Sequence, residues 1–189
     1  MFINSMTKKK TKIYNNKIIK DEKFNEINLD DIIFKWGKID ISNFDNSSIS
    51  NSDIGEGLIE NSNFINSNLK KVKNFHGKFS KCNFRNLVLE EYDGRDNIFN
   101  ECIFKDIIFK KSILRGSKFT SCFFKNCNFE NSDLKKVNFD NSDLDLINFL
   151  DCDLFMANYK CASSKKVIIS NSNTFLIKLK NDNKDIEIV

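Results

Sequence analysis

The sequence predicts an all-β solenoid, in which the chain winds into stacked coils around one central axis. From residue 24 to residue 159, every fifth residue is apolar except Asn74 and Gly94. Neither regular element explains this period, because it spreads side chains around an α-helix and alternates them across a flat β-strand. A chain that turns a corner in the same sense every five residues points all these side chains at the axis.

A second inward row supports the solenoid. Two residues before most apolar centres lies Ser, Gly, Cys or Ala, as at Ser62, Cys102 and Ser142. Small side chains suit an inward position beside a large centre, because protein interiors are close-packed. Proline is absent from the chain. A residue without an N–H would leave a hydrogen bond unmade in a structure whose coils pair with one another.

The units SDLKK, VNFDN, SDLDL, INFLD and CDLFM at 132–156 resemble those of the pentapeptide-repeat proteins. The resemblance spans roughly residues 22–160. It implies a right-handed quadrilateral β-helix with about twenty residues per coil, and hence about seven coils. One internal spacing agrees with four sides, since the interrupted centres Asn74 and Gly94 are twenty residues apart, as are Cys82, Cys102 and Cys122.

Residues 1–21 are expected to form a basic tail and an N-terminal cap. Residues 1–23 hold seven lysines against Asp21 and Glu22, which suits either a solvated segment or an arm for an anionic partner. The chain has no run of 18 apolar residues, and its first residues lack the apolar segment of a secretory signal. The sequence therefore favours a cytoplasmic protein with no membrane partner.

The two interruptions, residues 70–77 and 90–97, lie on one side of neighbouring coils. Asp93-Gly94 is a turn signal, and Gly94 permits a positive φ. One interpretation is a bulge without functional consequence. The alternative is a contact patch in which Phe75, His76, Tyr92 and Arg95 project from the rod.

Isoleucines precede the apolar centres in one coil, where the later coils carry Asn or Asp. They are Ile98, Ile103, Ile108 and Ile113, with Phe123 one coil beyond Ile103. Outward β-branched residues can simply favour the strand conformation. Alternatively, this isoleucine girdle is a partner-binding surface, because contiguous exposed apolar area commonly marks one.

Residues 161–189 leave the five-residue pattern and are expected to cap the last coil. Ser172 or Asn173 would begin a short helix that carries Phe175, Leu176 and Leu179 on one side. A cap is needed because an open coil end is a templating edge. The family resemblance implies that such a C-terminal segment can mediate a homodimer.

No feature of the sequence indicates catalysis, a metal or a cofactor. The chain has one histidine and none of the nucleotide-binding, zinc-protease or nucleophile-elbow motifs. Five of its six cysteines lie in the small inward row, and no CxxC pair occurs. We therefore expect reduced packing cysteines in a filled rod that is not an enzyme.

The remaining functions are binding functions. The resemblance extends to the proteins that protect DNA gyrase from quinolones or microcin B17 by mimicking duplex DNA, which requires an acidic surface. Residues 24–69 and 126–159 carry net charges of −6 and −5, but residues 70–125 hold 13 basic against 6 acidic residues. The alternative is a scaffold for another protein partner. Direct nucleic-acid binding is disfavoured, because the basic residues are scattered and flanked by carboxylates.

Overall fold

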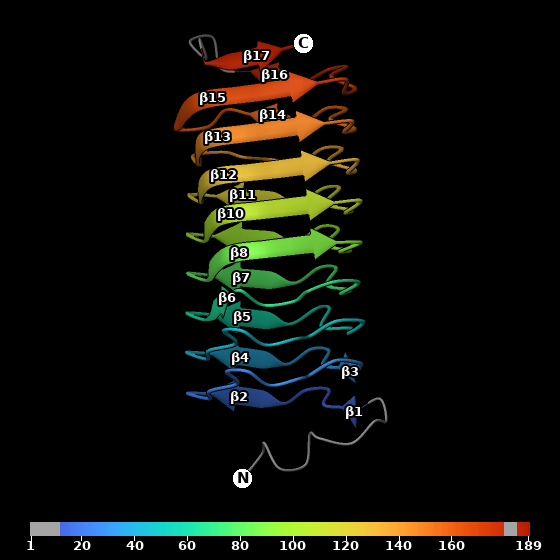
Figure 1. The fold of residues 1–189 in the computed structure, drawn as a ribbon, viewed down its shortest axis with the longest axis vertical. Helices are drawn as coiled ribbons and strands as arrows, with labels where there is room; N and C mark the ends of the chain where they lie inside the picture. Colours follow the sequence, from blue (N-terminus) through green and yellow to red (C-terminus); the bar gives the residue numbers. More distant parts are fainter. Residues whose placement is uncertain (1–11, 180–184) are drawn as a thin grey trace.

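The protein is a straight rod of stacked coils. The computed structural model describes residues 12–179 and 185–189, and in these the chain climbs through about eight turns. In Figure 1 the chain rises from its N-terminus at the bottom, the front strands run to the right and the rear strands run to the left. This sense of winding makes the helix right-handed. At a strand spacing of about 4.8 Å, eight turns span roughly 38 Å.

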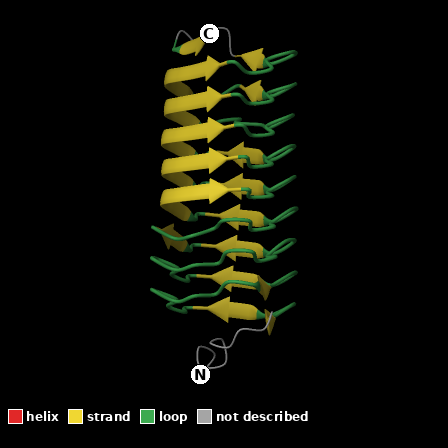
Figure 2. Ribbon diagram, turned by 45° about the vertical axis from the view of Figure 1, so that its right-hand side comes forward, coloured by secondary structure: helices red, strands yellow, loops and turns green. Residues whose placement is uncertain are grey.

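All the regular elements in the described residues are β-strands (Figure 2). They are β1 (Lys12–Ile13), β2 (Ile18–Lys20), β3 (Ile32–Ile33), β4 (Lys38–Asp40), β5 (Leu58–Glu60), β6 (Asn63–Ile65), β7 (Lys78–Ser80), β8 (Asn83–Glu90), β9 (Ile98–Asn100), β10 (Ile103–Lys110), β11 (Lys118–Thr120), β12 (Phe123–Glu130), β13 (Asp143–Leu150), β14 (Asn158–Tyr159), β15 (Ser163–Ser170), β16 (Lys178–Leu179) and β17 (Ile186–Ile188). Their pairing is parallel throughout, and the two larger sheets have seven and six strands.

Each coil has twenty residues and four sides, as the sequence predicts. Phe104 pairs with Phe84 below and with Phe124 above, twenty residues away in each direction. We number the sides by their order in the chain, so that Phe104, Phe109, Leu114 and Phe119 are the centres of sides 1 to 4 of one coil. The eight-residue strands cover sides 1 and 2, the six-stranded sheet forms side 4, and side 3 is joined by isolated bridges.

The core consists of columns of stacked rings. The rings of Phe104 and Phe124 are parallel within 9°, with centroids 4.6 Å apart. Rings of neighbouring sides meet edge to face, as Phe104 and Phe119 do at 5.6 Å. Offset stacks and edge contacts are the favoured geometries of aromatic pairs. The five-residue period therefore produces a filled interior.

Between residues 16 and 176, each corner except the one after Tyr159 is made by a residue with a left-handed backbone. These residues follow each centre by two positions and have φ near +50°, as in Trp36 at 54° and Asn126 at 53°. The turn expected at Gly94 is wrong, because the corner residue there is Asp96, with φ 55°. Asn tolerates this conformation best among side-chain-bearing residues, and others pay about 1–2 kcal/mol.

The coils extend beyond residues 22–160 at both ends. Strand β2 pairs with β4, and Ile19 is buried in the core. At the other end β15 pairs with β13, and β16 pairs with β14. Most of residues 1–21 that were expected to be a tail lie outside the described residues, but those from residue 12 onward belong to the ladder.

The prediction of a short C-terminal helix beginning at Ser172 or Asn173 is wrong. Ser172 Oγ accepts a hydrogen bond from Cys152 N, and Asn173 Nδ2 donates to Asp153 Oδ1. Both side chains therefore bond to the coil below instead of capping a helix. Strand β17 pairs with β15 and covers part of the last coil.

Candidate interaction surfaces

The interior of the rod has no room for a substrate. Two voids among the described core residues measure about 20 Å³ each, which suits a single water molecule. The inward serine hydroxyls form hydrogen bonds with backbone groups, as when Ser112 Oγ donates to Leu89 O at 2.6 Å. No cluster of three or more His, Cys, Asp or Glu side chains arranged to hold a metal occurs in residues 12–179 and 185–189.

All six cysteines are buried. Burial raises the pKa of the Cys127 thiol to about 12 and that of Cys152 to about 11. A thiol that stays protonated is a weak nucleophile and a weak metal ligand. Cys127 and Cys152 therefore behave as small core residues in the inward row.

The interruption on side 3 is a rearrangement of the core. Gly94 leaves its centre empty, and the ring of Tyr92 occupies the space, since a Cβ on Gly94 would lie 2.4 Å from Tyr92 Cε1. Asn97 Nδ2 donates to the Tyr92 hydroxyl at 3.2 Å, and Gly77 N donates to Asn97 Oδ1 at 2.7 Å. The expectation that Tyr92 projects is wrong, because it is 5% exposed.

Residues 70–77 and 90–97 stay within the coils. The bridge from Lys73 to Asp93 and the bond from Gly94 N to Ile113 O preserve the register. The other candidate contacts of this region face outward. Phe75 is half-buried against His76, and Arg95 is exposed.

The isoleucine girdle does not form one patch. Ile103, Ile108, Ile113 and Ile98 lie on four different sides of the rod, so a flat partner surface cannot contact all of them. Ile98 and Ile113 are 39% and 37% exposed, while Ile103 and Ile108 are half-buried. Only Ile103 has a large apolar neighbour from the predicted set, since it pairs with Phe123 on side 1.

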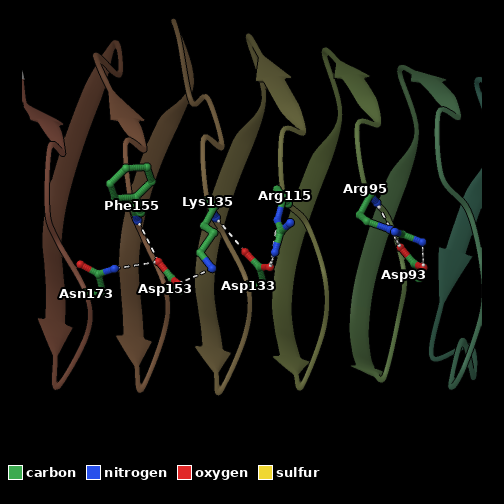
Figure 3. A network of polar contacts seen from close by, with 8 residues as sticks. All are labelled: Asp93, Arg95, Arg115, Asp133, Lys135, Asp153, Phe155 and Asn173. Carbon is green, nitrogen blue, oxygen red and sulfur yellow. Dashed lines mark hydrogen bonds and ion pairs between the residues drawn. The ribbon is translucent and has the colours of Figure 1, made fainter.

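Side 3 carries a column of cations that its own carboxylates neutralise (Figure 3). Arg95 donates two hydrogen bonds to Asp93 on the same coil, each 2.8 Å long. Arg115 instead reaches one coil ahead and donates from Nε to Asp133 at 3.1 Å. Position 113 holds isoleucine, so no carboxylate stands beside Arg115 on its own coil. Hydrogen bonding to these carboxylates raises the pKa of both guanidinium groups.

Side 1 carries a second column of cations with less compensation. Arg85, Lys105 and Lys125 stand directly above one another. Among the described residues no carboxylate pairs with Lys105 within 4 Å, and Lys125 Nζ is 3.8 Å from Asp145. Arg85 belongs to the scattered basic residues considered for nucleic-acid binding from the sequence, whereas Lys105 and Lys125 were not predicted as contacts. Their common spacing of twenty residues is the signal that identifies them once four sides are known.

Over the coils that the structure describes, no side of the rod presents a continuous acidic column. Every side has outward lysine or arginine in the middle coils, including Lys105 on side 1, Lys110 on side 2, Arg115 on side 3 and Lys118 on side 4. The carboxylates concentrate toward the two ends. The basic segment predicted from the sequence is therefore a belt around the whole rod.

Two further surface features lie toward the ends. Trp36, Glu56 and His76 line one wall of an open groove of about 540 Å³, in which Trp36 Nε1 donates to Glu56 Oε2 at 2.9 Å. At the C-terminal end Phe155 stacks on Phe175 at 5.9 Å, and Phe175 is 65% exposed. Leu176 and Leu179, the other predicted dimer contacts, are also exposed.

The fold defines a class of protein, the parallel β-solenoids built from short repeats. The family model described as "Pentapeptide repeats" matches residues 112–151 with 8 copies. Residues 112–151 are therefore pentapeptide repeats, and the described coils on either side continue the same pentapeptide-repeat fold. No curated protein sequence matches it.

Two solved structures share the fold. One is HetL, a pentapeptide-repeat protein involved in heterocyst differentiation regulation from the cyanobacterium Nostoc, with TM-score 0.54 and 12% identity over 98% of this chain and 91% of that chain. The other is trypsin-treated QnrB1, a plasmid-mediated fluoroquinolone resistance protein, with TM-score 0.52 and 16% identity over 94% and 91% of the two chains. Identities this low establish the common architecture.

Proposed function

We propose that this protein is a non-enzymatic, cytoplasmic rod that binds another protein along its outer wall. The observation that carries the proposal is the filled core, which leaves the lateral surface as the part of the molecule able to act on anything else. Rigid parallel ladders hold the outward side chains at fixed spacing, so a partner meets a preorganised surface.

The sharper form of the proposal names a type II topoisomerase as the partner. The gyrase-protecting members of the family and the shared architecture with QnrB1 support it. The belt of cations weighs against mimicry of DNA along the whole rod. A topoisomerase would therefore contact the acidic coils at one end, such as those bearing Asp143, Asp145 and Asp151.

Gyrase supercoiling assays test the sharper form. The purified protein should compete with DNA for gyrase and raise the quinolone concentration that traps cleaved complexes. The triple change of Asp143, Asp145 and Asp151 to asparagine should remove the protection. Absence of any effect of the wild-type protein at a tenfold molar excess over gyrase would eliminate the topoisomerase as partner.

The broader proposal requires a different measurement. Native cell extract passed over the immobilised rod should yield one stoichiometric protein, and the rod with Ile103→Lys and Phe123→Lys provides the surface control. Recovery of nucleic acid alone, with steep salt dependence, would point to direct nucleic-acid binding and contradict the proposal.

Self-association through the C-terminal end is part of the proposal. Phe175 and Leu176 are apolar, exposed and adjacent to the last coil. Light scattering at micromolar concentration should give a dimer mass, and Phe175→Asp with Leu176→Asp should give a monomer. A monomeric wild-type protein under these conditions would rule out this dimer.

A further inference from the structure

Three stacked cations on side 1 form a surface that the described part of the rod neutralises only at its upper end, where Lys125 Nζ lies 3.8 Å from Asp145 Oδ2. Arg85, Lys105 and Lys125 occupy equivalent positions of β8, β10 and β12, and the strand register places each above the last. The rungs of a parallel sheet are about 4.8 Å apart. Like charges at this spacing on directly opposed residues destabilise a sheet.

The hydrogen bonds around Arg85 and Lys105, the lower two members of this cationic ladder, do not cancel their charge. Arg85 Nε donates to the neutral Asn83 Oδ1 at 2.8 Å. The nearest carboxylate in sequence to Lys105 is Asp106 at the corner, which accepts a hydrogen bond from Asn126 Nδ2 at 2.7 Å. On side 3, by contrast, Arg95 and Arg115 have bonded carboxylates (Figure 3).

An apolar column adjoins the cationic ladder. Ile103 and Phe123 precede Lys105 and Lys125 by two residues on the same strands, so they point outward on the same face about 6.7 Å away. Phe123 is 38% exposed. Further along the long strands, over the corner on side 2, Val88 is 49% exposed. Cations beside exposed apolar groups complement a partner that presents carboxylates beside apolar side chains.

We infer that side 1 of β8, β10 and β12 is the docking surface for an acidic amphipathic α-helix of a protein partner, lying along the axis of the rod. The inference rests on the proposed role as a protein-binding rod. Three rungs span about 9.6 Å, and seven residues of α-helix span about 10.5 Å. Glutamates at i, i+4 and i+7 therefore meet Arg85, Lys105 and Lys125, and a neighbouring apolar stripe covers Ile103 and Phe123.

An extended strand fits this surface less well. Its side chains recur on one face about every 6.7 Å, so carboxylates aligned with the first rung miss the second. The separation between rungs thus selects a helix over an extended acidic segment.

The test uses the full-length protein and a fluorescein-labelled helical peptide with glutamates at i, i+4 and i+7 and leucines on the adjoining stripe. Binding is followed by anisotropy at physiological ionic strength. Lys105→Glu should weaken binding by at least about tenfold, because it reverses the middle rung. Lys118→Glu on side 4 is the matched control, with the same change in net charge, and should weaken binding less than about twofold. Circular dichroism verifies that both variants keep their β structure.

Three results would overturn the inference. The first is an equal loss of peptide affinity in the Lys105→Glu and Lys118→Glu variants. The second is equal affinity for a peptide of the same composition in scrambled order. The third is binding of heparin that is as tight as binding of the peptide and is weakened equally by Lys105→Glu. The gyrase assay is independent of these outcomes. The peptide can bind side 1 even if no topoisomerase binds the rod, and the side 1 inference can fail while another partner still binds elsewhere.

Discussion

The ring of Tyr92 fills the core position that Gly94 leaves empty, and the Tyr92 hydroxyl accepts a hydrogen bond from Asn97. A residue from the small inward row has thus exchanged roles with a residue from the centre row. The exchange keeps the coil filled and in register, so two apparent errors in the repeat form one local packing solution.

This exchange predicts that changes at residues 92 and 94 are strongly coupled. Gly94→Leu alone should destabilise the protein by about 2 kcal/mol or more, because its side chain meets the ring of Tyr92. Adding Tyr92→Ser restores the ordinary repeat and should recover at least about half of the loss. Urea unfolding of the four members of the double-mutant cycle measures the coupling. Additive losses would contradict the exchange.

The environment of Asn74 predicts that replacing this residue stabilises the protein. Its side chain is buried at an apolar centre beside one of the small voids, and its Oδ1 has no hydrogen-bond partner among the described residues. Asn74→Leu should therefore stabilise the fold by about 1–3 kcal/mol. The control is Asn97→Leu, which removes the bonds to Tyr92 and Gly77 and should destabilise it. A loss of stability in both variants, measured by urea unfolding, would show that Asn74 is a required polar group.

The corners predict a second stabilising substitution. Ile41 is a β-branched residue at φ 48°, and it is 52% exposed, so little packing offsets its backbone strain. Ile41→Asn should stabilise the protein by about 1 kcal/mol. Ile98→Asn is the matched control, since Ile98 is also exposed but lies in the extended backbone of β9. Equal effects on the unfolding midpoint would refute the role of the corner conformation.

The burial of the cysteines predicts that their thiols react slowly with alkylating reagents in the folded protein. Since burial raises the pKa of Cys152 to about 11, only about one thousandth of this thiol is ionised at pH 8. The folded protein should react with iodoacetamide slowly, and all six thiols should react quickly in urea. Raising the pH toward 11 increases the thiolate fraction, but burial continues to limit access. Mass spectrometry counts the modified residues, and rapid labelling of the native protein would reveal an open, reactive column.

The sequence by itself determined the winding, the core and the coil length. A centre every five residues can face one axis only in a solenoid, and the interruptions and cysteines at twenty-residue intervals agree with the four sides that the family resemblance implies. The aromatic columns, including the stack of Phe104 on Phe124, follow directly from that register.

Only the tertiary structure decided those features that depend on contacts with residues twenty positions away in the chain. Residues as different as Ile41 and Asn126 adopt the same left-handed conformation at the corners. The local sequence therefore does not predict this conformation. Ser172 and Asn173 suit a helix cap locally, but bonds to the coil below hold them in the ladder. Tyr92 turns inward because Gly94 leaves it space, and Lys105 joins a cationic ladder because Arg85 and Lys125 lie on adjacent rungs. Inter-coil contacts outweigh local preferences in such a fold, since each residue is held by the coils above and below it.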